Sequence, residues 1–319
     1  MKASYILLIA LIASSSSYAK LGGSNGFSGE ISLNTIYSSE KSQFNTDTDS
    51  SLVSLDQSAE SEDSFLVAPL GSLAYTFGQS SQQQVYLGTA RDDIAVGTLV
   101  MQLGYKYQLP SATIIDLAYL PTIKPGSTWQ NPYSTTGPRT ETDVSGNAYR
   151  LTLSNIADSR VSIDMAYADK TIENDALQGT ELARDGETYF IKGQIGIPVS
   201  RTTMLSPAIA YITQHGKGDT NSYDGYRAEL SLFQFFDRHK LALTTTYTKQ
   251  DYQQANTTFN DQTRSEDKVT FFAAYEYLNF MGWDNWSLIS FAGYSQTDAN
   301  IDFYDESQTI VSLGVNYKF

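Results

Sequence analysis

The chain has 319 residues and a formal net charge of −14, with 41% hydrophobic, 18% charged and 13% aromatic residues. It contains no Cys, which excludes disulfides, thiol nucleophiles and cysteine zinc centres. A mean hydropathy of −0.30 excludes a bundle of membrane helices, each of which needs about 20 nearly continuous apolar residues. The excess of negative charge argues against a nucleic-acid partner, because phosphate binders need a basic surface. We also expect no cofactor.

Residues 1–19 have the pattern of a secretory signal peptide. Lys2 gives a positive start, 6–13 is a short apolar run, and small residues at Ser17 and Ala19 suit a cleavage site. The apolar run is too short to span a bilayer. We therefore expect a mature chain of residues 20–319, which forms a single domain because no linker or composition shift divides it.

The rest of the chain alternates apolar and polar residues with a period of two, which is typical of strands with one apolar face. The clearest case is the last segment, where the odd-numbered positions from Val311 to Phe319 are apolar or aromatic. The predicted strands are 27–37, 64–77, 84–90, 96–107, 112–120, 144–154, 160–169, 188–198, 203–213, 224–235, 240–251, 267–279, 286–297 and 307–319. Short and long connections alternate between them.

Three features favour a membrane barrel over a soluble β-sandwich. Pairs of outward aromatic residues recur near the ends of strands on the short-turn side, as in Tyr75 and Phe77 or Tyr275 and Tyr277, which is typical of an interfacial girdle. Short turns and long loops alternate as in outer-membrane barrels, and the chain ends on an aromatic residue. We predict an antiparallel up-and-down transmembrane β-barrel of about 14 strands, with 12 as the main competitor, in the outer membrane of a Gram-negative bacterium.

The C-terminal strand resembles the recognition signal of outer-membrane barrels. Gly314 precedes two aromatic residues spaced two apart, Tyr317 and Phe319, and the second of them ends the chain. This resemblance implies the barrel assembly machinery as a partner, and the alternative is an ordinary C-terminal edge strand.

At the level of the whole chain, the sequence resembles a family of predicted outer-membrane proteins of Gram-negative bacteria that is known only as a domain of unknown function. The stretches that carry the resemblance are 65–71, 86–94, 143–150, 280–286 and 300–306. The resemblance implies a barrel over nearly the whole mature chain. It supplies no catalytic or binding residue.

The acidity of the chain belongs to the predicted outer loops. They hold 23 Asp and Glu against 8 Lys and Arg, and they are 38–63, 91–95, 121–143, 170–187, 214–223, 252–266 and 298–306. The simplest interpretation is solvation, and the alternative is binding of divalent cations beside lipopolysaccharide, which with outer-membrane lipid is an expected partner. Asp47, Asp49 and Asp56 resemble a calcium loop, but the turn glycine and flanking helices are missing.

An enzymatic function has little support in the sequence. A rim hydrolase would need a His paired with a carboxylate or amide, and the chain has only His215 and His239. His239 lies in a predicted tight turn. His215 begins an outer loop with Asp219 and Asp224 nearby, so a carboxylate within hydrogen-bonding distance of His215 would be the test.

Two functions of different classes remain open. A barrel of 14 strands falls between filled eight-stranded barrels and porins of 16 to 18 strands, so a narrow diffusion channel for small hydrophilic solutes is the first hypothesis. The second is a non-conducting structural or surface barrel that acts through its acidic loops. A channel should leave some lumen charges unpaired, whereas a structural barrel should neutralise them.

Two outer loops bear on this choice. The acidity and low apolar content of 38–50 predict that the loop 38–63 is mobile. The loop 121–143 is stiffer, since it contains four prolines, Trp129 and Tyr133, and it could enter the lumen as a constriction or stay at the rim.

Alternation also assigns the charges of the lumen wall. The inward ionisable residues are predicted to be Glu30, Lys106, Asp116, Arg150, Asp164, Lys192, Arg227, Glu229 and Glu276. If the turn at 155–159 centres on Ala157, Arg150 and Asp164 lie opposite one another on neighbouring strands, close enough for an ion pair. The alternative is that each charge is wetted separately by lumen water.

Overall fold

The structure is a computed structural model that describes residues 21, 24–89 and 100–319, so the predicted signal peptide 1–19 and the predicted loop 91–95 lie outside the described residues. The strands are β1 (Gly26–Lys41), β2 (Ser61–Phe77), β3 (Gln83–Gly88), β4 (Gln102–Gln108), β5 (Ile114–Pro121), β6 (Gly126–Trp129), β7 (Glu141–Ser154), β8 (Val161–Ile172), β9 (Gly186–Ile195), β10 (Ile197–Pro198), β11 (Thr203–Gly216), β12 (Tyr223–Phe236), β13 (His239–Asn256), β14 (Gln262–Leu278), β15 (Trp286–Ala299) and β16 (Glu306–Lys318). Five single-turn 3-10 helices lie between them: η1 (Ile156–Asp158), η2 (Asp219–Asn221), η3 (Thr257–Phe259), η4 (Phe280–Gly282) and η5 (Asp302–Tyr304). Within the described part of the chain, no helix is long and apolar enough to cross a membrane.

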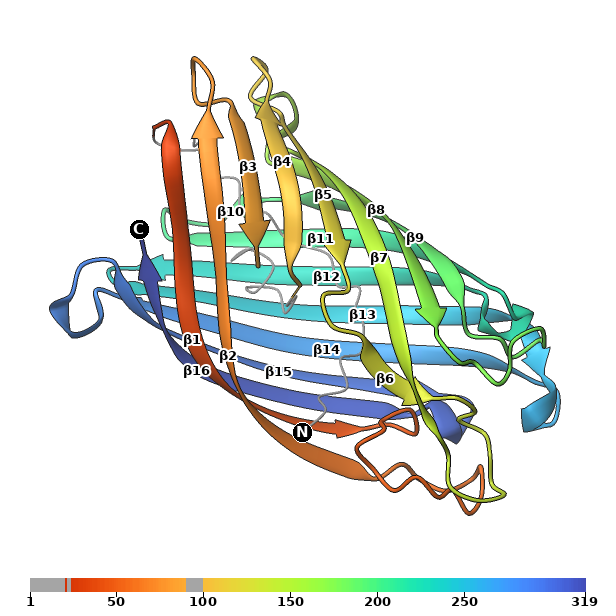
Figure 1. The fold of residues 1–319 in the computed structure, drawn as a ribbon. Coiled ribbons are helices and arrows are strands. Elements are labelled where there is room, and N and C mark those ends of the chain that lie inside the picture. Colours follow the sequence, from red (N-terminus) through yellow and green to blue (C-terminus); the bar gives the residue numbers. More distant parts are fainter. Residues whose placement is uncertain (1–20, 22–23, 90–99) are drawn as a thin grey trace.

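All sixteen described strands belong to one antiparallel sheet that closes on itself (Figure 1). The sheet closes because β16 pairs with β1 and β9 pairs with β11. Two of the strands are short continuations: β6 follows β5 along the same edge of β7, and β10 follows β9 along β11. The ring therefore has fourteen strand positions, which confirms the predicted fourteen-strand barrel and excludes twelve.

The two ends of the barrel differ. The short turns and Phe319 lie at one end, called the turn end here, where Gly29 and Phe319 exchange two backbone hydrogen bonds of 3.0 Å. The long connections lie at the other, the loop end, on the right in Figure 1. The strands run further toward the loop end than predicted, so the predicted loop 38–63 shrinks to 42–60 and the predicted loop 252–266 to 257–261.

The outer face of the barrel is apolar, as a lipid-facing wall requires. Ile209 is 73% exposed, Leu33 57% and Phe271 55%. Aromatic rings gather in contact with one another toward both ends of the wall. The turn end has the predicted pair Tyr75 and Phe77, with Phe27 packed against Tyr75. The loop end has a row of rings that the sequence did not predict: Tyr119, Tyr149, Tyr167, Tyr189 and His215.

The height of the apolar wall suits a bilayer. On β2 the exposed rings of Phe65 and Tyr75 are ten residues apart. For a strand that rises about 3.3 Å per residue and is tilted by about 40°, this spacing corresponds to roughly 25 Å along the barrel axis, the height of the apolar band of outer-membrane barrels.

The closing strand β16 depends on the residues that form the predicted assembly signal. A Cβ on Gly314 would lie 2.2 Å from Asn34 Oδ1 and 2.6 Å from the Leu33 carbonyl oxygen, so only glycine fits against β1 here. The ring of Tyr317 packs against Trp286 at a centroid distance of 5.1 Å and stacks on Phe319.

Deletion of Phe319 is expected to impair assembly of the barrel. The deletion removes both backbone hydrogen bonds to Gly29 and the ring that stacks on Tyr317, so the seam between β16 and β1 opens at the turn end. A backbone N–H or C=O group without a hydrogen-bond partner costs about several kcal/mol in lipid, because no water reaches it there. The measurement is the amount of heat-modifiable protein in the outer membrane, with Phe319→Tyr as the control. Equal amounts for the deletion and the control would contradict the prediction.

Candidate functional site

The nine predicted lumen charges lie on the face of the wall opposite the exposed apolar residues. Glu30, Lys106 and Arg227 are partly buried. The buried ones are Asp116, Arg150, Asp164, Lys192, Glu229 and Glu276. The strand register joins several of them into pairs on neighbouring strands.

The first pair joins β4 to β5. Lys106 and Asp116 are cross-strand partners, and their Nζ and Oδ2 atoms are 3.5 Å apart. Tyr86 on β3 completes the group, since its hydroxyl donates to Asp116 Oδ1 at 2.7 Å and Lys106 Nζ lies 4.9 Å from its ring centroid. Three neighbouring strands are thus tied together on the lumen side.

The second group is a triad centred on Lys192. Its Nζ atom lies 3.8 Å from Asp164 Oδ2 on β8 and 3.6 Å from Glu229 Oε1 on β12, and the Lys192 side chain is 0% exposed. The strand between Lys192 and Glu229 is β11, which contributes only the small residues Ala208 and Ala210 at this level. Because alanine leaves room above the wall, the lysine reaches across β11.

The predicted pairing of Arg150 with Asp164 is wrong. In the observed register Arg150 lies opposite Ala166, and Asp164 lies opposite Thr152, whose hydroxyl donates to it at 2.6 Å. The turn centres on Asp158, one residue later than predicted, because the register pairs Arg150 with Ala166 around the 3-10 turn η1. A shift of one residue in the centre moves each partner by two positions, so both side chains keep their lumen face. Arg150 donates instead to the Gln102 side chain of β4.

The remaining charges line the wall nearer to the two ends. Glu276 lies 3.3 Å from Lys240 and 3.7 Å from Lys318 at the turn end. Glu30 accepts a hydrogen bond of 3.3 Å from the Asn316 amide. Arg227 donates to Thr248 at 3.1 Å, and its guanidinium lies over the ring of Phe190.

Sequence reasoning missed apolar side chains on the lumen face. Phe272 and Phe291 are buried there with Ile36, next to the polar wall. The alternation of side chains along β14 was the available signal. Neighbouring residues face opposite sides, so one ring of Phe271-Phe272 must face the lumen. The even-numbered positions carry Lys268 and Glu276, which assigns Phe272 to the lumen. The lumen wall is therefore amphipathic rather than uniformly polar.

The long loops pack together into a second hydrophobic core at the loop end, called the loop cap here. Its buried members are Leu52, Tyr133, Leu177, Phe259, Ile301, Phe303 and Tyr304. They come from five connections. The loops of β6–β7 and β13–β14 leave nearly opposite sides of the ring, yet the rings of Tyr133 and Phe259 are 5.8 Å apart. The loop cap therefore extends over the mouth of the barrel.

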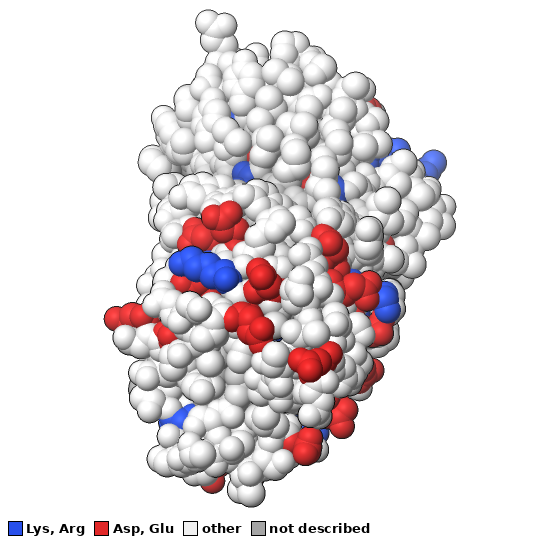
Figure 2. All heavy atoms as spheres, turned by 90° about the vertical axis from the view of Figure 1, so that its right-hand side faces the viewer, with Lys and Arg blue, Asp and Glu red and all other residues white. Residues whose placement is uncertain are grey.

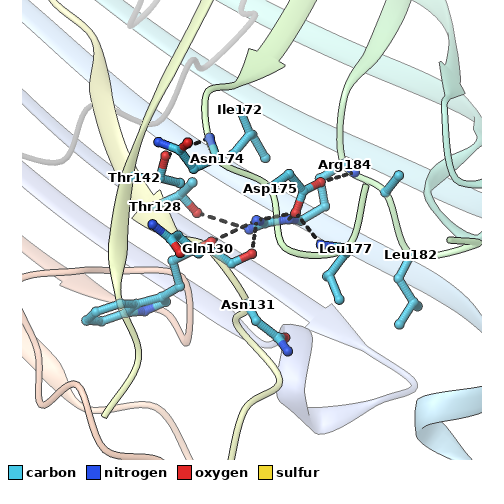
Figure 3. A network of polar contacts seen from close by, with 12 residues as sticks. Thr128, Gln130, Asn131, Thr142, Ile172, Asn174, Asp175, Leu177, Leu182 and Arg184 are labelled. Carbon is cyan, nitrogen blue, oxygen red and sulfur yellow. Dashed lines mark hydrogen bonds and ion pairs between the residues drawn. The ribbon is translucent and has the colours of Figure 1, made fainter. Parts of the chain in front are cut away.

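Polar contacts reinforce the loop cap around Arg184 (Figure 3). Its guanidinium pairs with Asp175 at 2.8 Å and donates to the carbonyl oxygens of Trp129 and Gln130 at 2.7 and 2.9 Å. The backbone N–H of Leu177 also donates to Asp175, at 3.2 Å. The ion pair lies within the β8–β9 loop, and the hydrogen bonds of Arg184 to the two carbonyl oxygens join this loop to the end of β6.

Of the two predicted constriction residues, Tyr133 belongs to the loop cap, whereas Trp129 is the last residue of β6. Trp129 is 2% exposed, donates to the Gln43 carbonyl oxygen at 3.1 Å and stacks with Arg139. The Tyr133 hydroxyl lies 2.9 Å from that of Tyr304, and burial raises the pKa of both phenols, so both stay protonated. The structure therefore places Tyr133 over the mouth and buries Trp129 at the end of β6.

The first loop, 42–60, packs in part against a neighbouring loop, a contact that the sequence analysis did not foresee. Gln43 and Leu52 are buried, and Arg139 donates to the carbonyl oxygens of Gln43, Asp49 and Ser50. The sequence analysis considered only the polar residues of 38–50, and it missed that a neighbouring loop supplies an arginine for their backbone carbonyls.

The weak metal candidates do not form a ligand set. The backbone N–H of Asp47 is bound by the Asn45 side chain at 2.9 Å, and Asp49 accepts from the backbone N–H of Ser51 at 2.8 Å. Asp56 lies further along the same loop, near Ser54. Over residues 24–89 and 100–319, no group of three or more His, Cys, Asp or Glu side chains is arranged to hold a metal ion.

The histidines have structural neighbours. The ring of His215 packs edge-on against Tyr189, and none of the described carboxylates forms an ion pair or hydrogen bond with it. His239 shares a 2.7 Å hydrogen bond with the Tyr275 hydroxyl and stacks on Phe236. The His–carboxylate pair required by a rim hydrolase is not formed at His215.

The loop end is acidic. Figure 2 shows Asp and Glu side chains spread over this end, with few Lys and Arg among them.

Several solved structures resemble the chain at low identity. A loop-deletion mutant of OmpT, an outer membrane protein of Vibrio cholerae, is 12% identical with a TM-score of 0.45, over 93% of this chain and 99% of that one. A FadL homologue of Pseudomonas aeruginosa is 9% identical with a TM-score of 0.46, over 92% and 90%. A structure described as the CymD monoaromatic hydrocarbon channel is 10% identical with a TM-score of 0.45, over 92% and 89%.

No curated protein matches the chain. One family model does, and it covers residues 26–318, which is the whole barrel from β1 to β16. The chain belongs to the family described as "Protein of unknown function (DUF2860)".

Proposed function

We propose that the protein is an outer-membrane barrel of a Gram-negative bacterium, exported with a cleaved signal peptide, and that its lumen is a narrow passage for small hydrophilic solutes. In this orientation the turn end faces the periplasm, and the acidic loop end faces outward, toward lipopolysaccharide and its divalent cations. The barrel assembly machinery is the proposed partner for insertion. No catalytic role is proposed.

The observation that carries this proposal is a fourteen-strand ring with a charged inner wall. Strands about 4.8 Å apart and tilted by about 40° enclose a backbone ring roughly 28 Å across, too wide for wall side chains alone to fill. A lumen of this width with polar walls holds water in outer-membrane barrels unless a loop or helix fills it. The loop cap narrows the mouth of this passage, and the ion pairs on the wall narrow its lumen.

A second candidate is a closed surface barrel, and one observation favours it. The wall charges around Lys106 and Lys192 are compensated by carboxylates on neighbouring strands, and the loop cap extends over the mouth. Neutralised lumen charge was the pattern expected of a structural barrel. The two candidates differ in one measurable property, which is ion flow.

The test is the conductance of the purified protein in planar bilayers. We expect small, discrete current steps at neutral pH, well below those of an open porin of 16 strands, because the loop cap narrows the mouth. The control is the same preparation after heat unfolding. Insertion of folded, heat-modifiable protein without any current steps would overturn the channel and favour the closed barrel.

A further inference from the structure

The chain before β1 is fixed to the rim of the barrel at the turn end. Asn25, the residue before β1, is held on the β2–β3 turn. Its side-chain amide donates to the Gly78 carbonyl oxygen at 2.9 Å, and its Oδ1 atom accepts from the Ser81 hydroxyl at 2.9 Å. Earlier in the chain, the Leu21 carbonyl oxygen accepts from the side-chain amide of Gln84 on β3, also at 2.9 Å. Three hydrogen bonds thus tie this segment to two neighbouring strands and their turn.

Gln84 faces the lumen, which places Leu21 inside the mouth of the barrel. The neighbouring residue Val85 is 42% exposed on the lipid-facing side, so Gln84 points the other way. The cross-strand partner of Gln84 is Thr76, which is 1% exposed and accepts a second hydrogen bond from the same amide at 2.9 Å. Because Thr76 also pairs with Gly26, the Leu21 carbonyl lies on the lumen side at the level where β1 begins.

Gly26 permits a reversal of the chain at this point. Its φ of 135° is a backbone conformation that residues with a side chain rarely adopt. Asn25 lies beyond Gly26, at the turn, whereas Leu21 lies back at the level of Gly26 and on the lumen side. The segment that starts at Leu21 and ends at Asn25 therefore folds over the rim, and it is called the N-terminal strap here.

The wall beside the N-terminal strap carries charges that cancel. In the same row of the register, Lys106 lies opposite Asp116, with Nζ and Oδ2 3.5 Å apart. The proposed removal of 1–19 makes Lys20 the first residue of the mature chain, directly before Leu21. At neutral pH its α-amino group and its side chain are both protonated. The mature chain therefore brings two positive charges to a row whose described charges are balanced.

We propose that the N-terminal strap narrows the turn-end mouth of the lumen and presents the charges of Lys20 there, so that the mouth admits anions more readily than cations. Fixed positive charges at a constriction attract anions and repel cations. The proposal rests on the proposed function, since it takes over the cleaved signal peptide and the passage of solutes, and it names the charge class of these solutes.

The position of the N-terminal strap can be tested without ion flow, because the chain contains no Cys. The variants are Leu21→Cys and Ser80→Cys, the second at an exposed residue of the same rim. Each folded, heat-modifiable variant reacts with a maleimide attached to a large polymer. We expect Leu21→Cys to react about tenfold more slowly than Ser80→Cys, because the three hydrogen bonds have to open first. Equal rates would overturn the proposal.

The anchors of the N-terminal strap are tested in the Leu21→Cys protein. Adding Asn25→Ala and Gln84→Leu removes all three hydrogen bonds, so the reaction should become as fast as that of Ser80→Cys. The matched control is Gln83→Leu, because Gln83 adjoins Gln84 but accepts from the Tyr105 hydroxyl on the lipid-facing side. An equal acceleration in the control would overturn the assignment of the anchors.

The charge of the mouth is tested with Lys20→Gln. We expect the ratio of K⁺ to Cl⁻ permeability to rise about twofold, because one of the two fixed positive charges is removed. The matched control is Arg201→Gln, since Arg201 is exposed in the turn 199–202 at the same end of the barrel. The intact mass of the purified protein identifies its first residue. A first residue other than Lys20, or equal permeability ratios for the two variants, would overturn the role of Lys20.

The two kinds of measurement separate this proposal from the proposed function. If Leu21→Cys is protected and the barrel conducts with the expected shift in Lys20→Gln, both proposals are supported. If Leu21→Cys is protected but no current is seen, the N-terminal strap stands and the channel falls. If the barrel conducts and Leu21→Cys reacts as fast as Ser80→Cys, the N-terminal strap falls and the channel stands.

Discussion

Replacement of Lys192 with Met is expected to shift the lumen toward cation selectivity. Lys192 is the only described cation within 4.0 Å of Asp164 and Glu229, so its loss leaves two buried carboxylates that it compensated. A wall with uncompensated carboxylates attracts cations and repels anions. We expect the ratio of K⁺ to Cl⁻ permeability, measured from reversal potentials in a salt gradient, to rise several-fold.

The same variant should lower the stability of the barrel. Removal of one partner of a buried ion pair costs about 3–5 kcal/mol, because the other charge stays buried without compensation. The matched control is Lys240→Met, which changes the net charge equally but leaves Lys318 beside Glu276. The triple variant Lys192→Met with Asp164→Asn and Glu229→Gln should restore selectivity. Equal reversal potentials for Lys192→Met and Lys240→Met would contradict the role of the triad.

Replacement of Arg184 with Ala is expected to loosen the loop cap and raise the conductance. The Arg184 side chain is 6% exposed and its partner Asp175 1%, so the substitution leaves a buried carboxylate and frees the Trp129 and Gln130 carbonyls. Loss of the pair costs about 3–5 kcal/mol. The hydrogen bonds of Arg184 to the Trp129 and Gln130 carbonyls are lost as well, so the β8–β9 loop separates from β6. Single-channel recording should show larger steps with more frequent transitions.

A second measurement keeps this prediction independent of ion flow. Limited proteolysis of intact cells should cut within 42–60 or 173–185 in Arg184→Ala and leave the unmodified protein intact. The matched control is Lys249→Ala, since Lys249 and its partner Asp251 are 47% and 57% exposed and such surface pairs contribute about 0–1 kcal/mol. Protease resistance and conductance equal to those of the control would show that Arg184 does not hold the loop cap.

The sequence predicted the barrel because a membrane wall is governed by local alternation. All fourteen predicted strand segments correspond to strand positions of the ring, and the nine lumen charges lie on the face that parity assigned. A period of two fixes which face a side chain takes, whatever its partner on the next strand. The terminal aromatic motif was readable for the same reason, since it depends on spacing within one strand.

Pairing between strands needed the tertiary structure. The partner of Asp164 depends on where the turn at 155–160 centres, and the residues Ala157 and Asp158 both take the left-handed conformation there, which the sequence did not indicate. The contact of Lys192 with Glu229 depends on Ala208 and Ala210 of β11, which lies between their two strands in the ring. An offset of one residue at a turn was enough to replace the expected ion pair with Thr152.

The sequence by itself determined the fold class, the strand positions and the faces of the wall, because alternation and turn residues act over a few neighbouring positions. Only the tertiary structure decided the loop cap and the triad around Lys192. Both join residues of different strands or loops, such as Tyr133 with Tyr304 or Lys192 with Glu229. Such contacts depend on which loops and strands the closed ring brings together, and local alternation does not specify those partners.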